Sequence, residues 1–164
     1  MTHRLASLLP LCLLGCLIAC DDGPPTFGDV LDDPQVPPRG SEDAVTWIED
    51  GHYLTWACEA EPHPPRGSSP HHRNRICSNT ALATSTGTGA YPVGAAAVKE
   101  IFDASGSIAQ YALYRKVLAG DGGDTWYWFE GIRGDVPFNG EGESTCTDCH
   151  SSAPRDFVFT VVTD

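Results

Sequence analysis

The side chains best suited to chemistry stand close together in residues 146–150. Cys146-Thr147-Asp148-Cys149-His150 has the pattern C-x-x-C-H, which places two thiols and an imidazole within one tight turn of helix. This is the attachment signature of c-type haem: the thiols bond the two vinyl groups on one edge of a porphyrin, and the histidine ligates its iron. The motif therefore predicts one covalent haem c held by Cys146, Cys149 and His150, with His150 as the axial ligand of the iron.

Two other uses of paired cysteines fit less well. A structural zinc site needs a second C-x-x-C or a paired histidine motif. The sequence contains neither, and Cys58 and Cys77 are poorly spaced to complete one. A thioredoxin-like redox pair belongs to a βαβ pattern, which the sequence also lacks. Haem attachment is therefore the interpretation we favour.

The sequence also restricts what can bind the iron opposite His150. Met1 is the only methionine, so the His/Met ligation of many electron-carrier cytochromes c is excluded once a leader is removed. A histidine, a lysine and an open position remain as alternatives. An open position would serve small-ligand binding or catalysis, whereas a filled one would serve electron transfer.

The loop at residues 59–75 supplies histidines and arginines that are candidates for the distal side of the haem. One histidine could be the distal ligand or a proton donor, and one arginine could pair with a haem propionate. The simpler interpretation, which we favour, is a solvated basic loop. The residues are His63, His71, His72, Arg66, Arg73 and Arg75.

The N-terminal residues have the composition of a secretory signal. Arg4 precedes an apolar run from Leu5 to Ala19, which Asp21 and Asp22 end. A run of this length after a positive charge is typical of a signal peptide and is short for a membrane span. We therefore predict that residues 1–19 form a signal peptide and that the protein is exported.

Leu17-Ile18-Ala19-Cys20 resembles a lipobox, in which the cysteine is acylated and becomes the first residue after cleavage. Leu13-Leu14-Gly15-Cys16 fits almost as well, but cleavage there would leave apolar residues beyond the anchor. We therefore predict lipidation of Cys20 and a lipoprotein anchored to the bacterial cell envelope, at its periplasmic face or outer surface. An ordinary secreted protein is the plainer alternative.

The net charge of the chain limits the classes of partner that it can bind. All 22 acidic residues follow the predicted cleavage site, and the formal net charge is −12. This balance argues against nucleic acid and against anionic lipid surfaces. We expect a small-molecule ligand or substrate and a redox partner protein, with the membrane reached only through the N-terminal lipid.

Four cysteines remain once residues 1–19 are removed and Cys20 carries lipid. Unpaired thiols are uncommon in an oxidising compartment, so the four divide into one attachment pair and one disulfide. We predict a disulfide between Cys58 and Cys77, which would pin the loop between them.

The elements before the haem motif must position it. Residues 20–40 are rich in proline, aspartate and glycine, and we predict that they form a disordered tether. The haem domain is predicted to span residues 41–164. Its first part should be helical: Ser41 caps one helix, Tyr53–Cys58 forms a second, and Asn79 or Thr80 starts a third that the glycine turn at residues 87–89 ends.

Three β-prone runs follow, separated by turn sequences at residues 103–106 and 120–123, and this spacing predicts an antiparallel meander. The runs are Val93–Phe102, Ile108–Leu118 and Thr125–Ile132. The aromatic residues Trp126, Tyr127, Trp128 and Phe129 should alternate between the core and a haem pocket. With Phe157–Val162 as a further strand, the predicted fold class is α+β. The domain would be small and dominated by an antiparallel sheet, with short N-terminal helices and a C-terminal haem-binding segment.

Two blocks of the sequence resemble the cytochrome P-460 and cytochrome c′-beta family. One block is Tyr91-Pro92-Val93-Gly94 with Ala97-Val98-Lys99-Glu100-Ile101 after it, and the other is the C-x-x-C-H motif with Asp156-Phe157-Val158-Phe159-Thr160 after it. Tyr111–Val117 and Trp126-Tyr127-Trp128-Phe129-Glu130 complete the pattern of strands before the motif. The resemblance covers residues 43–164.

This resemblance implies a small β-rich fold with a five-coordinate haem, often as a homodimer. Some members oxidise hydroxylamine with nitric oxide, which would make this chain a haem oxidoreductase, and others bind nitric oxide or related diatomic molecules. In the catalytic members a lysine of the Val-Lys-Glu strand is cross-linked to the porphyrin, and Lys99 matches that lysine. The alternative function is a lipid-anchored mono-haem electron-transfer cytochrome with histidine–histidine or histidine–lysine ligation. A third is a haem that only holds a small fold together.

The residues around Lys99 bear on the same question. On an extended strand Lys99 shares a face with Ala95, Ala97 and Ile101, and the small alanines leave room for a flat macrocycle. The plainer alternative is a lysine that snorkels at a sheet edge near Glu100.

Overall fold

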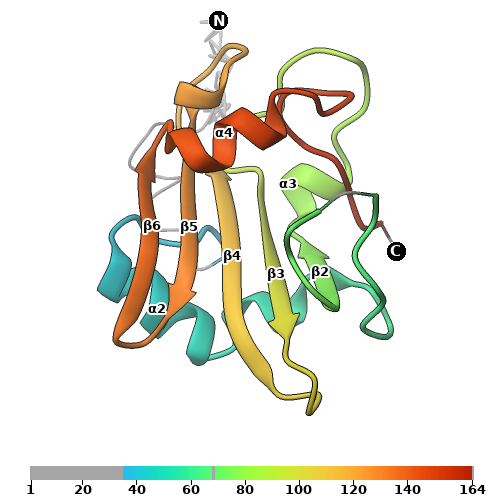
Figure 1. Ribbon diagram of the computed structural model, residues 1–164. Coiled ribbons are helices and arrows are strands. Elements are labelled where there is room, and N and C mark those ends of the chain that lie inside the picture. Colours follow the sequence, from blue (N-terminus) through green and yellow to red (C-terminus); the bar gives the residue numbers. More distant parts are fainter. Residues whose placement is uncertain (1–34, 68, 164) are drawn as a thin grey trace, which may run out of the picture.

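Six strands form an antiparallel sheet in which each strand pairs with its neighbours along the chain, in the order β1-β2-β3-β4-β5-β6 (Figure 1). The computed structural model describes residues 35–67 and 69–163. The strands are β1 (Ala57–Cys58), β2 (Asn74–Ser78), β3 (Ala96–Phe102), β4 (Ile108–Lys116), β5 (Trp126–Ile132) and β6 (Asp135–Glu141). The helical elements are α2 (Ser41–Glu49), η1 (His52–Thr55), α3 (Thr80–Ala83), η2 (Gly123–Thr125) and α4 (Ser144–His150). The domain is α+β and dominated by one antiparallel sheet, as the sequence predicts.

The predicted meander of β3, β4 and β5 is confirmed, with strands shorter than the β-prone runs. Asp103 closes the β3–β4 turn, because its Oδ1 accepts the backbone N–H groups of Ser105 and Ser107 at 2.8 and 3.0 Å. Gly106 supplies the φ of 87° that this turn requires. β3 begins at Ala96 rather than at Val93, since Gly94 has a φ of 91° and belongs to the preceding turn.

Three strands were not predicted: β1, which lies in a segment predicted as a helix, β2 and β6. β2 lies within and just after the segment predicted as a loop, whose prolines, histidines and arginines mask the short buried stretch around Ile76. β6 contains Pro137 and Gly140, which weaken any β pattern in the sequence. The outer position of β6 in the sheet tolerates a proline, because an edge strand does not need every backbone N–H for pairing.

Two segments adopt a different structure from the one predicted. Tyr53–Cys58 is not a helix, because residues 52–55 form the 3-10 turn η1 and Ala57–Cys58 pairs with β2 as β1. Phe157–Val162 is not a strand. Asp156 and Phe157 have positive φ values of 39° and 65°, and the bridge there joins Val158 to Arg155. The segment after α4 is therefore a turn followed by extended chain.

The predicted helix starts are close to those observed. Ser41 is the first residue of α2, and Gly40 takes the cap position predicted for Ser41. α3 begins at Thr80, one of the two predicted starts, and Asn79 caps it, because its Oδ1 accepts the backbone N–H of Leu82 at 3.0 Å. α3 ends at Ala83, before the glycine turn that was expected to end it.

The predicted signal peptide, Cys20 and most of the predicted tether lie outside the described residues. Residues 35–40, predicted as the end of the tether, lie against the domain. Val36 and Pro37 are buried, and the Pro37 carbonyl accepts a hydrogen bond from Arg115 Nη1 at 2.6 Å. The domain therefore starts before Ser41. In the described part of the chain, no helix combines the length and apolar character needed to cross a bilayer.

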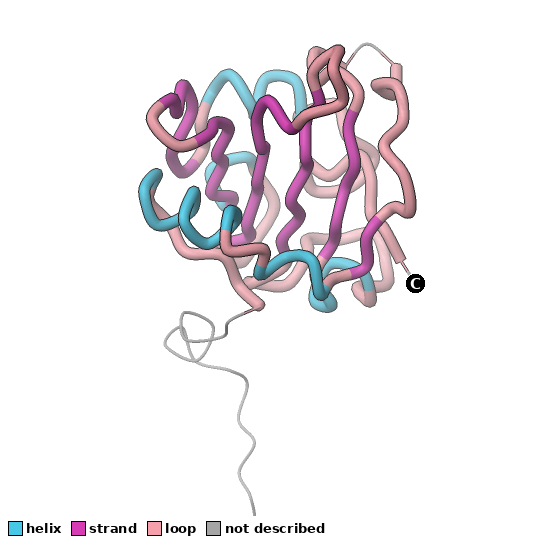
Figure 2. Tube along the Cα trace, turned by 90° about the horizontal axis from the view of Figure 1, so that it is seen from below, coloured by secondary structure: helices cyan, strands magenta, loops and turns pink. Residues whose placement is uncertain are grey.

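Helices lie on both sides of the sheet (Figure 2). Each face is therefore covered, and each buries its own set of side chains. α2 covers one face, and α3, α4 and the C-terminal residues cover the other. Along β5, Tyr127 and Phe129 pack under α2, whereas Trp126 and Trp128 pack on the opposite face. This confirms the alternation predicted for the four aromatic residues. We call the face that carries Trp126 and Trp128 the α4 face.

Cys58 and Cys77 stand directly opposite each other in the β1–β2 pair and form the predicted disulfide. They are 19 residues apart in sequence. The bond therefore closes the loop after β1 at its base and fixes both of its ends to the sheet.

Candidate functional site

α4 places the C-x-x-C-H motif over the α4 face, where the helix lies across the ends of β4 and β5 (Figure 1). The Glu143 carboxylate caps the helix by accepting the backbone N–H of Thr145 at 3.2 Å. Cys146 is half-buried and packs with apolar side chains of the α4 face, while Cys149 is exposed. Both cysteines are free thiols, so they are available for the attachment that the motif predicts.

The surroundings of Cys146 favour the neutral thiol. Burial, and then the nearby carboxylates of Glu130 and Glu143, raise the pKa of the Cys146 thiol to about 12. Redox-active cysteines act as thiolates, which a low pKa favours. The raised pKa of Cys146 therefore opposes the redox-pair alternative, and it is compatible with a thiol that forms a thioether.

The imidazole of His150 is held at one nitrogen and packed against three rings. Its Nδ1 lies 2.7 Å from the Phe157 carbonyl oxygen, and because a carbonyl only accepts, Nδ1 carries the proton and Nε2 the lone pair. Its ring centroid is 4.7 Å from that of Trp128, 5.3 Å from Phe159 and 6.0 Å from Tyr114. Burial lowers the pKa of His150, so the ring is neutral. A neutral imidazole bonded at one nitrogen to a carbonyl is the usual form of a metal-binding histidine.

A row of paired side chains crosses the α4 face from β2 to β6. In register it consists of Ile76, Lys99, Ala112, Glu130 and Phe138. The small side chain of Ala112 stands between the two charged residues, so no bulky group on β4 separates Lys99 from Glu130. We call this set the Lys99–Glu130 row. The row has one residue from each of the five strands β2 to β6, and the pairing of these strands brings together residues far apart in sequence.

Both charged members of the row have shifted pKa values. Burial lowers the pKa of Lys99 to about 8, and Glu130 opposes this shift with a smaller effect. Burial raises the pKa of Glu130, and Lys99 opposes that shift in turn. The two shifts bring the amine and the carboxyl closer in acidity, as is common where side chains exchange protons near neutral pH.

Lys99 is not at a sheet edge, so the plainer interpretation of this lysine was wrong. β3 is an inner strand paired on both sides. Glu100 points to the opposite face, where it accepts hydrogen bonds from Tyr53 at 2.6 Å and from Arg75 at 2.7 and 2.8 Å. Lys99 instead shares the α4 face with Ala95 and Ala97, as the alternation of the strand predicts.

His71 is the loop histidine that approaches the Lys99–Glu130 row. Its Nδ1 is 3.6 Å from Glu130 Oε2, which is longer than a hydrogen bond. Burial, and then the charges of Lys99 and His150, lower the pKa of His71 to about 3. The ring is therefore neutral, and its contact with Glu130 is not an ion pair. His71 and His150 approach the α4 face from different segments of the chain.

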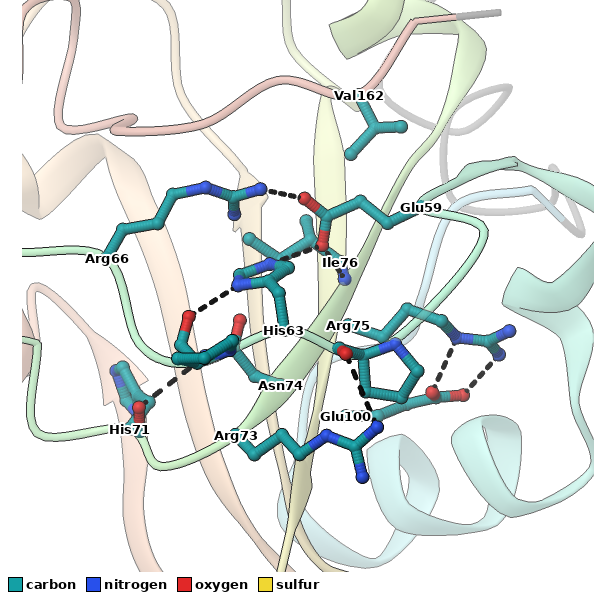
Figure 3. Close-up of polar contacts among 12 residues, drawn as sticks. Glu59, His63, Arg66, His71, Arg73, Asn74, Arg75, Ile76, Glu100 and Val162 are labelled. Atoms are coloured by element: carbon teal, nitrogen blue, oxygen red, sulfur yellow. Dashed lines mark hydrogen bonds and ion pairs between the residues drawn. The ribbon is translucent and has the colours of Figure 1, made fainter. Parts of the chain in front are cut away.

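The other loop histidines do not join this site, because the loop is tied to β2 by a network centred on Glu59 (Figure 3). Glu59 accepts hydrogen bonds from Arg66, from His63 Nε2 at 2.9 Å and from the backbone N–H of Ile76 at 2.9 Å. His63 is thus engaged within the loop, and His72 is exposed. The loop is solvated at Arg66, His72 and Arg73, as predicted, although Glu59 ties part of it to β2.

The loop arginines differ in their relation to the site. Arg75 pairs with Glu100 on the face opposite α4, and Arg73 donates to the Pro62 carbonyl at 3.4 Å. Arg66 pairs with Glu59 and also acts on the site electrostatically, because its charge lowers the pKa of Lys99. Of the three loop arginines, Arg66 is therefore the one whose charge affects the pKa of a site residue.

Two functional groups of the site were not predicted from the sequence. Glu130 continues the alternation of Trp126 and Trp128 on β5, so strand periodicity could have placed it on the same face. The Phe157 carbonyl is a backbone group aimed at His150 by a turn with two positive φ values. No side-chain pattern in the sequence predicts such a turn.

The residues at α4 fit the chemistry of a c-type haem. A porphyrin supplies four nitrogen ligands itself, and the protein must add one axial imidazole, which His150 presents with its lone pair on Nε2. Across residues 35–67 and 69–163, no three His, Cys, Asp or Glu side chains gather as a bare metal ion would require. A comparison of the sequence with family models found no match, and neither did a search of curated proteins. A functional assignment therefore depends on the motif and on the geometry described above.

Proposed function

We propose that this chain is an exported c-type haem lipoprotein whose iron keeps an open distal position, and that it binds nitric oxide or related small nitrogen oxides or oxidises hydroxylamine. The observation that carries the proposal is the state of His150, a neutral, partly buried imidazole in a C-x-x-C-H helix, hydrogen-bonded through Nδ1 to the Phe157 carbonyl. This arrangement is typical of a histidine that ligates a metal. The resemblance to the cytochrome P-460 and cytochrome c′-beta family supports the substrate class.

Three residues of α4 would hold the haem. Cys146 and Cys149 would form its two thioether bonds, and His150 would be its axial ligand. When bound, the haem supplies an iron that coordinates small ligands and exchanges electrons. The protein's own contribution on this side is orientation, since the Trp128 ring lies 4.7 Å from the imidazole and the Phe157 carbonyl holds Nδ1.

Lys99 and Glu130 support a reactive site over a simple electron carrier. Burial raises the pKa of Glu130, so its carboxyl holds a proton more readily than an exposed carboxyl does, as a proton donor beside a reactive group must. With a pKa of about 8, the Lys99 amine is uncharged in a substantial fraction of molecules. An uncharged amine is a nucleophile, which supports Lys99 as the counterpart of the lysine that is bonded to the porphyrin in the catalytic members of the resembled family.

A lipid-anchored electron-transfer cytochrome is the second candidate, and the position of His71 favours it. His71 is neutral, lies by the α4 face beside Glu130, and is near enough to His150 that a positive charge on that ring would lower the pKa of His71. If His71 binds the iron opposite His150, the distal position is closed. A redox partner protein would then replace the small molecule as the principal partner.

Spectroscopy of the exported, reduced protein separates these candidates. The open-site proposal predicts a high-spin five-coordinate spectrum and saturable binding of nitric oxide and carbon monoxide, with a red-shifted Soret band if Lys99 is bonded to the porphyrin. The bis-histidine candidate predicts a low-spin spectrum that becomes high-spin in His71→Ala but not in the exposed-residue control His72→Ala. A low-spin protein that binds neither gas contradicts the open-site proposal.

Activity then separates binding from catalysis. If the protein turns over, hydroxylamine should be consumed in the presence of nitric oxide and an electron acceptor, and Lys99→Arg should lose both this activity and any red shift. A Lys99→Arg variant with an unchanged spectrum would show that Lys99 is not bonded to the porphyrin. The protein would then be a gas binder with an ordinary haem c.

Lipid attachment at Cys20 belongs to the same proposal and concerns residues outside the described structure. A Cys20→Ser substitution should release the exported protein from the membrane fraction. Cys16→Ser is the matched control and should leave the protein anchored. A Cys20→Ser protein that still sediments with membranes contradicts the assignment of the anchor.

A further inference from the structure

We propose that the buried ion pair between Lys116 and Asp156 positions the proximal histidine, because it holds the turn that presents the Phe157 carbonyl to His150 Nδ1. This inference rests on the proposed function, since it takes His150 as the iron ligand. Lys116 and Asp156 touch neither thiol of the motif. Their role would be to fix a backbone oxygen and, through it, the orientation and electron donation of the imidazole.

The ion pair is fully enclosed and fully bonded. The side chains of Lys116 and Asp156 are 0% and 1% exposed, and Nζ lies 2.7 Å from Oδ2 and 2.9 Å from Oδ1. Lys116 Nζ also donates to the Gly120 carbonyl and to Thr125 Oγ1, each at 2.7 Å. The ammonium is thereby anchored to the end of β4 and to the loop that leads into β5.

Asp156 in turn is bonded to three separate parts of the domain. Its Oδ2 accepts the backbone N–H of Tyr91 at 2.8 Å, and its Oδ1 accepts the Trp126 indole N–H at 3.2 Å. Together with Lys116, these contacts fix the carboxylate from the segment before β3, from β4 and from β5. The carboxylate is therefore a rigid attachment point for the turn after α4.

The backbone at this turn needs such an attachment. Asp156 and Phe157 both have positive φ, at 39° and 65°, a conformation that is unfavourable for a residue with a side chain. The Phe157 carbonyl follows directly and accepts the His150 Nδ1 proton at 2.7 Å. If the Asp156 carboxylate loses its partners, the turn is free to relax toward negative φ, and the carbonyl moves away from His150.

A purely stabilising role explains the pair less well. A buried ion pair adds little stability over packed apolar side chains of similar volume, because desolvation offsets the attraction. What the pair does provide is a fixed position for the Phe157 carbonyl oxygen. A stronger hydrogen bond from Nδ1 to a carbonyl makes an imidazole a better electron donor to its metal, so the pair would act on the iron through Phe157 and His150.

Resonance Raman spectroscopy of the iron–histidine stretching band tests this inference. The reduced protein is compared in the His71→Ala background, so that the position opposite His150 is open. Asp156→Asn, Lys116→Met and the double variant are each expected to shift the band to lower frequency. Asp121→Asn removes an exposed carboxylate from the loop before β5 and is the matched control, with no shift expected. The double variant leaves no buried charge without a partner, so it tests the geometry even where a single variant folds poorly.

The outcomes are distinguishable. A direct effect of charge on the iron would move the reduction potential in opposite directions in Asp156→Asn and Lys116→Met, whereas loss of positioning lowers the stretching frequency in both. If the protein binds haem through His150 and the double variant keeps the parental band, the positioning role is wrong and the proposed function stands. If the parent protein carries no haem on Cys146 and Cys149, the proposed function and this inference both fail.

Discussion

Lys99 and Lys116 are the two lysines of the sequence, and the structure predicts very different reactivity for them. Burial lowers the pKa of the Lys99 amine to about 8. At pH 8 about half of the Lys99 amines should then be uncharged, against about 0.3% for a lysine at the ordinary value of 10.5. The concentration of nucleophile therefore rises about a hundredfold. Lys116 is fully buried in its pair with Asp156 and should not react at all in the folded protein.

Competitive labelling with trace acetic anhydride measures this difference. The protein is used without haem, as the Cys146→Ser/Cys149→Ser variant, and labelled across about pH 6 to 11 both folded and in denaturant. Mass spectrometry of the peptides that contain Lys99 and Lys116 gives the labelled fraction of each lysine. In the folded protein Lys99 should titrate with a midpoint near 8, and in denaturant both lysines should titrate at the ordinary value.

Glu130→Gln sharpens this test, because the sign of its effect is fixed by the charge. The Glu130 carboxylate raises the pKa of Lys99 against the larger effect of burial, so its removal should lower the Lys99 midpoint further. A folded-state midpoint near 10.5 for Lys99 would show that the amine is solvated. The argument that the Lys99–Glu130 row is a buried reactive site would then be refuted.

Three further predictions concern stability. Removing the disulfide with Cys58→Ser/Cys77→Ser should lower the free energy of unfolding by about 3 kcal/mol, from the loop-closure entropy of a 19-residue separation; equal denaturation midpoints for the two proteins would contradict this. Asp156→Asn leaves Lys116 buried without a counter-charge and should destabilise by about 3–5 kcal/mol, while Lys116→Met/Asp156→Asn should lose less, by urea denaturation. Glu130 has a raised pKa in the folded state, so its ionisation destabilises the fold as pH rises from the ordinary carboxyl pKa to the raised pKa of the folded protein. Glu130→Gln should therefore be more stable than the parent at neutral pH, and calorimetry should show that the gain disappears below the ordinary carboxyl pKa of 4.5.

The features of the fold that were predicted correctly depend on residues close together in the sequence or on a single covalent bond. The β3–β4 turn follows from Asp103 and Gly106, and the sides of β5 follow from simple alternation of its aromatic residues. The disulfide followed from counting cysteines in a chain predicted to be exported, and the structure places Cys58 and Cys77 in register. In each case a few neighbouring residues, or one covalent constraint, determine the outcome.

The parts that were missed depend on partners distant in the sequence. β2 becomes a strand because β3 pairs with it, although the prolines and basic residues just before it suggest a loop. The segment at residues 157–162 has strand-forming side chains, but the bonds of Asp156 to Tyr91, Lys116 and Trp126 hold a turn before it. Propensity within the segment cannot anticipate contacts of this kind.

The same division applies to the candidate site. The motif at Cys146, Cys149 and His150 is contiguous, so its spacing alone predicts haem attachment. The Lys99–Glu130 row exists only through the register of β3, β4 and β5, and His71 reaches it only because Glu59 and Ile76 tie the loop to β2. Lys99 was predicted through the family resemblance, whereas its place beside Glu130 follows only from the register of the sheet.

The central claim is that Cys146 and Cys149 carry a haem whose iron is ligated by His150. The most direct measurement is the mass of the tryptic peptide that contains the motif, taken from protein exported by a host with intact cytochrome c maturation. The account predicts a red protein in which this peptide carries one porphyrin, with both thiols protected from alkylation. A colourless protein in which both thiols react with iodoacetamide would contradict it.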